Sequence, residues 1–277
     1  VSAIAVALAP LAGILNMKVL GEDGAGTTEE VVTAIDDCID LLVTDPDIAP
    51  HVINLSLGAI DDDNVDDPLR VACRAAINNG IWVIASAGNS GPAGMSVTSP
   101  ACEKYVAAVG SVRYLYGSET FIVSDFSSRG PTRGGLIKPD VVIFGEDFVI
   151  ASSESDTAVA AKSGTSFSTS FISGMGILYH EGVIKVGGVV INNGIKPEEV
   201  WSIGLKNLMD VHLSGVSLKP PGAPTDKDNN YGYGMPFGPY ITKKITETTA
   251  APAIELSGIL SAVMVVGMMG MMMKGIQ

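Results

Sequence analysis

Apolar residues along this chain fall into two spacings, and their order predicts a sheet whose strands are joined by helices. Continuous apolar runs at residues 11–20, 51–57 and 81–86 are typical of strands that are buried on both faces. Between these runs, apolar residues recur at helical spacing over residues 31–42 and 65–77. Strands and helices that alternate in this way form right-handed crossovers in a parallel sheet. We therefore expect an α/β fold with three layers, α/β/α, around a mostly parallel sheet.

Other apolar runs and short polar signals predict the remaining elements. Thr27 and Glu30 have the spacing of a capping box, so the first crossover helix begins there. A further apolar, helix-length pattern begins at Phe167. The other expected elements are a helix at residues 1–9, strands at 105–112 and 141–144, an edge strand at 187–193, and a helix at 197–208.

The last part of the chain differs in composition from the rest. Residues 242–254 are rich in Thr, Ala and Pro, and residues 256–273 contain no charged side chain. At about 1.5 Å per residue this stretch forms a helix of roughly 27 Å, enough to cross the hydrocarbon core of a bilayer. A buried core helix is the alternative, but the stretch follows a linker and is apolar on every face. We expect a main domain over residues 1–241, a linker over 242–254 and a transmembrane anchor over 255–274.

Composition excludes several classes of protein. Hydrophobic residues make up 47% of the 277 residues, which excludes an intrinsically disordered chain. The formal net charge is −13, from 30 acidic and 17 basic residues. This charge argues against a nucleic-acid-binding protein, because binding of nucleic acid requires a basic surface. Cys38, Cys73 and Cys102 are widely separated, so we expect free thiols and neither a zinc site nor disulfides. The acidic loop at residues 61–67 is a solvated loop or a cation site, and the first interpretation is favoured.

Candidate chemistry lies where small polar residues follow the predicted strands. Residues 56–58 (Ser-Leu-Gly) end one strand, and residues 86–89 (Ser-Ala-Gly-Asn) end the next. In parallel sheets, chemistry gathers at these carboxyl ends. Residues 164–166 (Gly-Thr-Ser) open a predicted helix, where the helix dipole favours developing negative charge at a serine hydroxyl. The alternative is that Thr165 or Ser166 is an ordinary helix N-cap.

Several stretches resemble the subtilisin-like serine proteases, the subtilase family, in the family's order and spacing. The resemblance covers about residues 1–240, and each motif is short by itself. The motifs are residues 17–24 (Met-Lys-Val-Leu-Gly-Glu-Asp-Gly), 52–58 (Val-Ile-Asn-Leu-Ser-Leu-Gly), 87–91 (Ala-Gly-Asn-Ser-Gly), 126–131 (Phe-Ser-Ser-Arg-Gly-Pro), 138–142 (Lys-Pro-Asp-Val-Val), 164–169 (Gly-Thr-Ser-Phe-Ser-Thr) and 231–234 (Tyr-Gly-Tyr-Gly).

The resemblance implies a serine endopeptidase that acts on peptides or proteins. Ser166 is then the nucleophile, and Asn89 donates its side-chain N–H to the oxyanion, together with the Ser166 backbone N–H. Residues 56–58 pair with the substrate backbone, and residues 86–88 wall the main specificity pocket. The implied substrate-binding residues are Ser56, Leu57, Gly58, Ser86, Ala87, Gly88 and Thr165. No cofactor is required, and no ligands of the calcium ions common in the family can be placed in this sequence.

The sequence departs from the family at the other two catalytic residues. The family carries an aspartate on an early strand and a histidine in a His-Gly-Thr-type helix start, and neither motif is present. His51, His180 and His212 are the only histidines, and none has the position of the base. Because residues 1–9 resemble the remainder of the histidine helix, we expect the missing pair upstream of Val1 and an inactive fragment here. Ser170 also replaces a usual proline, and residues 143–144 (Ile-Phe) replace a usual Ala-Pro.

The leading hypothesis is therefore an endopeptidase that is anchored by its C-terminal helix at the cell surface or outside the cell. The alternative is an inactive subtilase-like module that binds or scaffolds peptides at a membrane, although the retention of Ser166 and Asn89 argues against it. An unrelated α/β hydrolase is excluded, because no Gly-x-Ser-x-Gly elbow occurs at a strand-to-helix turn.

Overall fold

The computed structural model describes residues 1–115, 120–152, 154–180 and 219–236. The main sheet consists of β1 (Val52–Leu55), β2 (Trp82–Ser86), β3 (Ala107–Leu115), β4 (Thr120–Val123) and β5 (Val141–Phe144). Strands β1, β2 and β3 run parallel in that order, β5 runs parallel to β3, and β4 pairs antiparallel with β3. The mostly parallel sheet and four of its expected strands are therefore confirmed.

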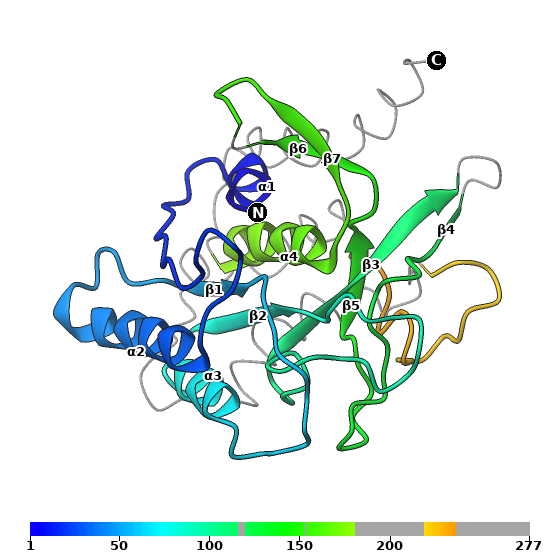
Figure 1. Ribbon diagram of the computed structural model, residues 1–277, viewed down its shortest axis with the longest axis horizontal. Coiled ribbons are helices and arrows are strands. Elements are labelled where there is room, and N and C mark those ends of the chain that lie inside the picture. Colours follow the sequence, from blue (N-terminus) through cyan, green and yellow to red (C-terminus); the bar gives the residue numbers. More distant parts are fainter. Residues whose placement is uncertain (116–119, 153, 181–218, 237–277) are drawn as a thin grey trace, which may run out of the picture.

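Helices cover both faces of this sheet (Figure 1). Helices α1 (Ser2–Leu8) and α4 (Thr165–Tyr179) pack together on one face, whereas α2 (Thr28–Thr44) and α3 (Pro68–Asn78) pack together on the other. Strand β2, in the middle layer, is buried along its whole length. The predicted three-layer α/β/α arrangement is confirmed.

The predicted capping box is also confirmed at the start of α2. The backbone N–H of Glu30 donates to the Thr27 Oγ1 at 3.2 Å, and the backbone N–H of Thr27 donates to the Glu30 carboxylate at 2.7 Å. Two backbone donors that the helix itself leaves unpaired are satisfied in this way.

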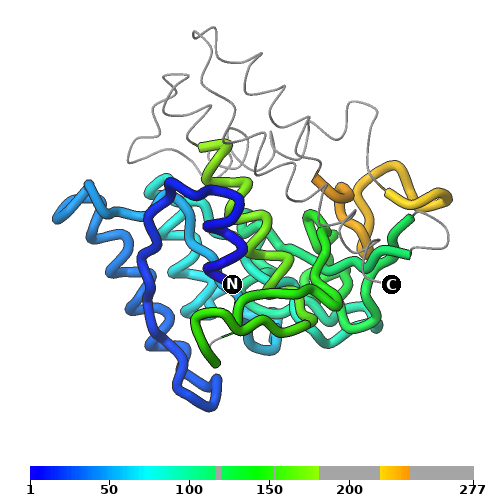
Figure 2. The backbone as a smooth tube through the Cα atoms, turned by 90° about the horizontal axis from the view of Figure 1, so that it is seen from above, coloured from blue at the N-terminus to red at the C-terminus, as the bar shows by residue number. Residues whose placement is uncertain are grey.

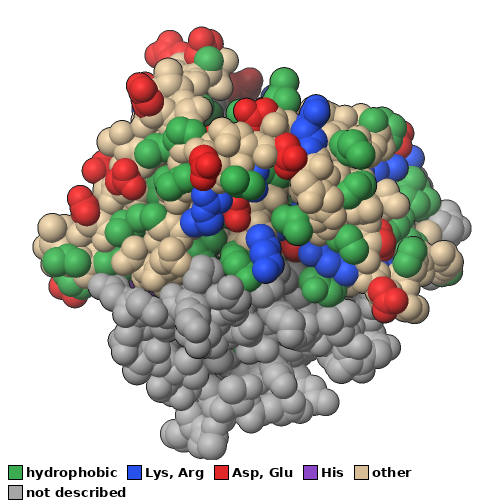
Figure 3. All heavy atoms as spheres, turned by 90° about the horizontal axis from the view of Figure 1, so that it is seen from below, with side chains coloured by type: hydrophobic (Ala, Val, Ile, Leu, Met, Phe, Trp, Pro, Cys, Tyr) green, Lys and Arg blue, Asp and Glu red, His purple; other side chains and the backbone are tan. Residues whose placement is uncertain are grey.

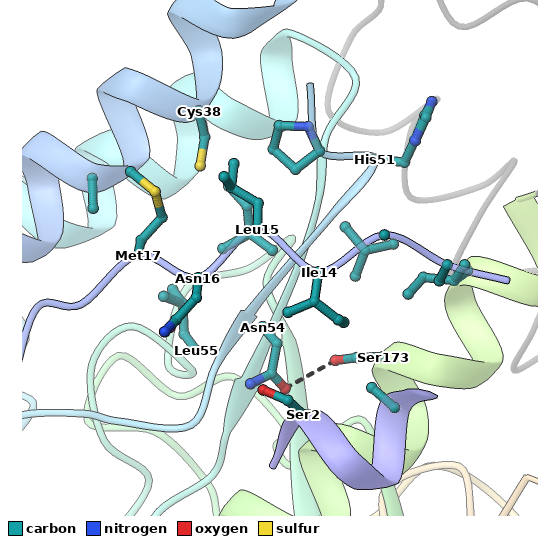
Figure 4. Close-up of a pocket in the computed structure, with 18 of the residues that line it drawn as sticks. Ser2, Ile14, Leu15, Asn16, Met17, Cys38, His51, Asn54, Leu55 and Ser173 are labelled. Atoms are coloured by element: carbon teal, nitrogen blue, oxygen red, sulfur yellow. Dashed lines mark hydrogen bonds between the residues drawn. The ribbon is translucent and has the colours of Figure 1, made fainter. Parts of the chain in front are cut away.

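Residues 11–20 do not form the predicted buried strand. The side chain of Leu11 is fully exposed, and those of Ile14 and Leu15 are 47% and 41% exposed. Within the described part of the chain, residues 13–20 make no backbone hydrogen bond to a strand, and they share with β1 a cavity of about 640 Å³ (Figure 4). An apolar run becomes a strand only where its backbone groups find a partner. The prediction was wrong because the apolar pattern carries no information about that partner.

A hairpin that the apolar pattern did not predict lies between β5 and α4. Its strands, β6 (Phe148–Ala151) and β7 (Val159–Lys162), pair antiparallel outside the main sheet. The ring of Phe148 meets the ring of Phe171 edge to face, with the ring centroids 5.0 Å apart. The hairpin therefore packs on the helix that carries Ser166.

Residues 219–236 lie beside the β3–β5 side of the sheet, on the opposite side from α2 (Figure 2). The Lys138 ammonium, whose residue is 1% exposed, donates to the Asp140 Oδ2 at 2.7 Å, and Lys227 donates to the Oδ1 at 2.7 Å. Burial by itself would raise the pKa of Asp140, but the two lysines outweigh it and hold this pKa below its usual range. This buried charge cluster of Lys138, Asp140 and Lys227 joins residues 219–236 to the start of β5.

Several predictions fall outside the described residues. They are the edge strand at 187–193, the helix at 197–208, the linker at 242–254, the anchor at 255–274 and the residue His212. Among the residues that the structure describes, no helix is both long enough and apolar enough to span a membrane.

Candidate active site

Helix α4 begins at Thr165 and places Ser166 in its first turn. The N-cap is Gly164, and no side chain caps the helix. The alternative that Thr165 or Ser166 is the N-cap is therefore wrong, because both residues already belong to the helix. The backbone N–H groups at a helix start are unpaired and carry partial positive charge. This position favours a negative charge that develops beside Ser166.

Ser166 is half-buried and faces the carboxyl end of β1. Its Oγ donates to the Ser56 carbonyl oxygen at 3.2 Å, and the Ser56 Oγ donates to the Ser166 carbonyl oxygen at 3.0 Å. Ser170, which stands at the position of a usual proline, lies inside α4, and its Oγ donates to the Ser166 carbonyl oxygen at 2.9 Å. A carbonyl oxygen is too weak a base to remove the proton of a serine hydroxyl. Ser56 therefore orients Ser166 without activating it.

Asn89 reaches the same helix start from the end of β2. Its Oδ1 accepts the Thr165 backbone N–H and the Thr165 hydroxyl, each at 2.9 Å. These two donors assign the oxygen of the amide, so the Nδ2 is left as the donor for another group. Thr165 itself is fully buried. The structure therefore brings Thr165 to the site through its contact with Asn89.

The two strand ends that carry the other predicted site residues are neighbours. Strands β1 and β2 pair in register from Val52 with Trp82 to Leu55 with Ala85. The chain continues from there into residues 56–58 and 86–88, and the Ser86 Oγ donates to the Leu57 carbonyl oxygen at 3.4 Å. Ser86 and Ala87 are buried, Gly88 is half-buried and Gly58 is exposed. The predicted substrate-binding residues thus lie side by side at one edge of the sheet, next to Ser166.

The two described histidines lie at the other end of α4. The rings of His51 and His180 have centroids 4.2 Å apart. His180 directly follows α4 and is 14 residues after Ser166, which corresponds to roughly 21 Å along a helix. His51 precedes the amino end of β1, whereas Ser166 faces its carboxyl end. Neither ring is near the Ser166 hydroxyl.

The three cysteines and the acidic loop form no described hydrogen bond with Ser166 or Asn89. Cys38, Cys73 and Cys102 are free and buried, as predicted, and burial raises the pKa of the Cys102 thiol to about 12. In the acidic loop, Asp61 is 5% exposed and lies 3.9 Å from the Arg70 guanidinium. The described residues contain no group of three or more His, Cys, Asp or Glu side chains that could hold a metal ion.

Two residues lie behind the strand ends: Thr98, which no motif contains, and Ser128, which belongs to the motif at residues 126–131 but had no role assigned from the sequence. A Cβ atom added to Gly88 would lie 2.7 Å from the Ser128 Oγ and 2.8 Å from the Thr98 Cγ2. Gly88 also has a φ of 110°, which glycine adopts without a steric penalty. The glycine was the available signal, but its partners are 10 and 40 residues further along the chain. No local spacing connects them.

Comparison with known proteins agrees with this geometry. A model of the subtilase family matches residues 2–234. Serine protease AprX of Bacillus subtilis is 34% identical over 146 residues, which are 51% of this chain and 33% of that protein. The subtilisin of a Bacillus species (strain TA39) is 33% identical over 172 residues, which are 61% of this chain and 40% of that protein. The chain thus spans about a third to two fifths of the length of these two relatives.

The solved structure of sphericase has the same fold. It superposes with a TM-score of 0.61 at 23% sequence identity, covering 79% of this chain and 66% of the other. The family match begins in helix α1 and ends within residues 219–236, which follow α4 in the chain. It therefore contains every described strand. On these findings, the chain belongs to the subtilase family.

Proposed function

We propose that this chain is the part of a serine endopeptidase that carries its nucleophile and its oxyanion site. One observation carries the proposal: Ser166 and the side chain of Asn89 meet at two adjacent strand ends around the first turn of α4. A hydroxyl and an amide N–H at a helix start are two of the groups that acyl transfer requires. The relatives of this chain include a protein named as a serine protease.

In the proposed reaction, the Ser166 Oγ attacks the carbonyl carbon of a peptide bond and its proton passes to a general base. The carbonyl oxygen becomes an oxyanion that accepts from the Asn89 Nδ2 and from the Ser166 backbone N–H. The C–N bond then breaks, the amine leaves with the proton, and water hydrolyses the acyl ester on Ser166. Residues 56–58 hold the substrate backbone as an added strand, and residues 86–88 wall the side chain beside the scissile bond.

No described histidine is placed to act as the general base of this mechanism. Both described histidines lie at the far end of α4, and the Ser166 Oγ donates instead to a backbone carbonyl. We propose that the histidine and its carboxylate come from residues that precede Val1 in the gene. The 277 residues by themselves are then inactive, and the assembled enzyme needs no cofactor for the acyl-transfer steps.

A fluorophosphonate probe tests this proposal, because it reacts only with an activated serine. The complete gene product should be labelled at Ser166 and hydrolyse peptides, whereas the 277-residue chain should do neither at a measurable rate. Ser166→Ala in the complete protein is the matched control and should abolish both signals. A complete protein that binds peptides but shows no labelling would instead support the inactive binding module. A gene without a His-Gly-Thr segment upstream would overturn the assignment of the base.

We also propose that residues 255–274 anchor this domain in a membrane, with the protease domain outside the cytoplasm. The proposal rests on the uncharged stretch at residues 256–273 and on the linker before it. After expression in cells, the chain should stay with the membrane pellet in alkaline carbonate, and deletion of residues 255–277 should release it. Release of the undeleted chain would overturn the anchor and leave the peptidase proposal untouched.

A further inference from the structure

We propose that Ser128 is a positioning residue of the oxyanion site, because it holds the backbone on both sides of Asn89. This inference rests on the proposed function, since it concerns the residue whose Nδ2 donates to the oxyanion. Ser128 acts through Asn89 and needs no contact of its own with the substrate.

Two hydrogen bonds join Ser128 to the residues directly before and after Asn89. The Ser128 backbone N–H donates to the Gly88 carbonyl oxygen at 2.9 Å. The Ser128 Oγ accepts the Ser90 backbone N–H at 3.1 Å. A single residue therefore fixes the backbone on either side of Asn89, and one of the two bonds depends on its side chain.

These bonds matter because the loop that carries Asn89 lies on the surface. Asn89 and Ser90 are both exposed, and the backbone of an exposed loop moves unless hydrogen bonds hold it. Ser128, in contrast, is fully buried, and a Cβ atom added to Gly88 would lie 2.7 Å from its Oγ. The buried serine thus packs closely against the loop and joins it to the interior.

The backbone and the side chain of Asn89 are held by different parts of the molecule. Ser128 holds the backbone, whereas Thr165 holds the Oδ1 through two donors at 2.9 Å each. With both of these fixed, the Nδ2 points in one direction. A donor stabilises an oxyanion only when it is already aimed at the position where the charge develops. Loosening the backbone contact should therefore slow the chemical step.

The neighbouring residue Ser127 provides a matched control. It is also fully buried, but its Oγ accepts the backbone N–H of Ser111 in β3 at 2.9 Å. Ser127→Ala and Ser128→Ala each remove one buried hydroxyl that accepts one backbone N–H. Only Ser128→Ala removes a contact next to Asn89, so a difference in kcat between the two variants reports on Asn89 and not on stability.

Hydrolysis of a peptide substrate by the complete protein tests this role. Ser128→Ala should lower kcat by about tenfold at unchanged KM, because the oxyanion donor loses one neutral hydrogen bond behind it. Ser127→Ala should leave kcat unchanged. In the Asn89→Asp background, which already lacks the donor, Ser128→Ala should cause no further fall in kcat. Ser128→Cys, whose sulfur is a weaker acceptor, should give a smaller fall and replaces Ser128→Ala if that variant unfolds.

An equal fall in kcat in Ser127→Ala and Ser128→Ala would overturn the inference, and so would an undiminished effect of Ser128→Ala in the Asn89→Asp background. A second measurement needs no activity. The side-chain amide NMR signal of Asn89 should shift or broaden in Ser128→Ala and stay unchanged in Ser127→Ala. If the fluorophosphonate probe does not label the unmodified complete protein, the peptidase proposal fails and the NMR comparison alone decides whether Ser128 positions Asn89. An unchanged Asn89 signal in Ser128→Ala would then overturn the inference.

Discussion

Asn89 has two polar side-chain atoms with two separate tasks. Its Oδ1 accepts both donors of Thr165, at 2.9 Å each, and this ties the end of β2 to the start of α4. Its Nδ2 is the donor that we assign to the oxyanion. Because the tasks fall on different atoms, substitutions can separate the structural contribution of this residue from its catalytic one.

Asn89→Asp keeps an oxygen for Thr165 but removes the donor. We expect kcat of the complete protease to fall about 100- to 1000-fold, which is the effect known for the corresponding asparagine of subtilisin, with little change in stability. Asn89→Ala should lose a similar activity and also about 1–3 kcal/mol of stability, because it leaves the Thr165 N–H unpaired. Peptide hydrolysis and urea denaturation measure the two effects. Equal stability of the two variants would contradict the structural task, and an unchanged kcat would contradict the catalytic one.

Thr165 acts on the same amide through its hydroxyl. Thr165→Val removes that hydrogen bond and keeps the backbone one, so Asn89 becomes less firmly positioned. We expect kcat to fall by up to about tenfold at unchanged KM, from the loss of one neutral hydrogen bond of about 0.5–1.5 kcal/mol. Thr165→Ser keeps the hydroxyl and should restore kcat. A change in KM alone would show that Thr165 contacts the substrate directly.

At the scale of elements, helices and strands were predicted correctly where the sequence signal for them lies within one short segment. The capping box of α2 needs only Thr27 and Glu30, and the apolar runs at β1 and β2 form strands as expected, with β2 buried along its whole length. The start of α4 shows the opposite case. Its residue types suggested a side-chain cap, but its Thr165 N–H is satisfied by Asn89, which is 76 residues away. A contact at that separation leaves no local pattern.

The wrong prediction of a buried strand at residues 11–20 has the same cause. Their apolar run matches a buried strand as well as that of β2 does, but β2 has a parallel partner on each side. Residues 13–20 have no such partner within the described chain. The resemblance to subtilases located Ser166 and Asn89 because it carries the non-local contacts of a whole family. It did not locate Thr98, which no motif contains.

The capping box gives a prediction at this scale. Thr27→Ala removes the oxygen that accepts the Glu30 N–H, and we expect it to cost about 1 kcal/mol of the free energy of unfolding. Thr27→Ser keeps that oxygen and should cost much less. Urea denaturation of both variants measures the difference. Equal costs would show that the methyl group of Thr27, and not the cap, stabilises this end of α2.

At the scale of the whole molecule, the buried charge cluster differs from the surface charges in its exposure to water. On the face seen in Figure 3, acidic and basic side chains are interspersed with hydrophobic ones. Exposed pairs of this kind contribute little to stability, because water and salt screen them. Lys138 and Asp140 are each 1% exposed, and the Asp140 Oδ2 also accepts the Ala108 backbone N–H at 2.7 Å. The cluster therefore joins β3, β5 and residues 219–236 through contacts that are shielded from water.

Asp140→Asn leaves Lys138 buried without its counter-charge. Removal of one partner from a buried pair costs about 3–5 kcal/mol, and we expect a loss of that size at pH 7 in urea denaturation. Asp226→Asn changes an exposed aspartate in the same segment and serves as the matched control. A comparable loss in both variants would show that the net charge of the segment matters, and not the buried pair.

The dependence on pH tests the cause of that loss. The pKa of Asp140 is lowered in the folded protein, because Lys138 and Lys227 outweigh the effect of burial. Its contribution to stability is therefore complete above the pKa of an unfolded aspartate, about 3.9, and is lost as the pH falls through the lower folded value. The difference in the free energy of unfolding between the unmodified chain and Asp140→Asn should be largest near pH 7 and shrink below about pH 4. A difference that stays constant from pH 7 to the lowest pH at which the chain folds would mean that Asp140 stabilises the fold independently of its charge, through contacts that asparagine does not reproduce.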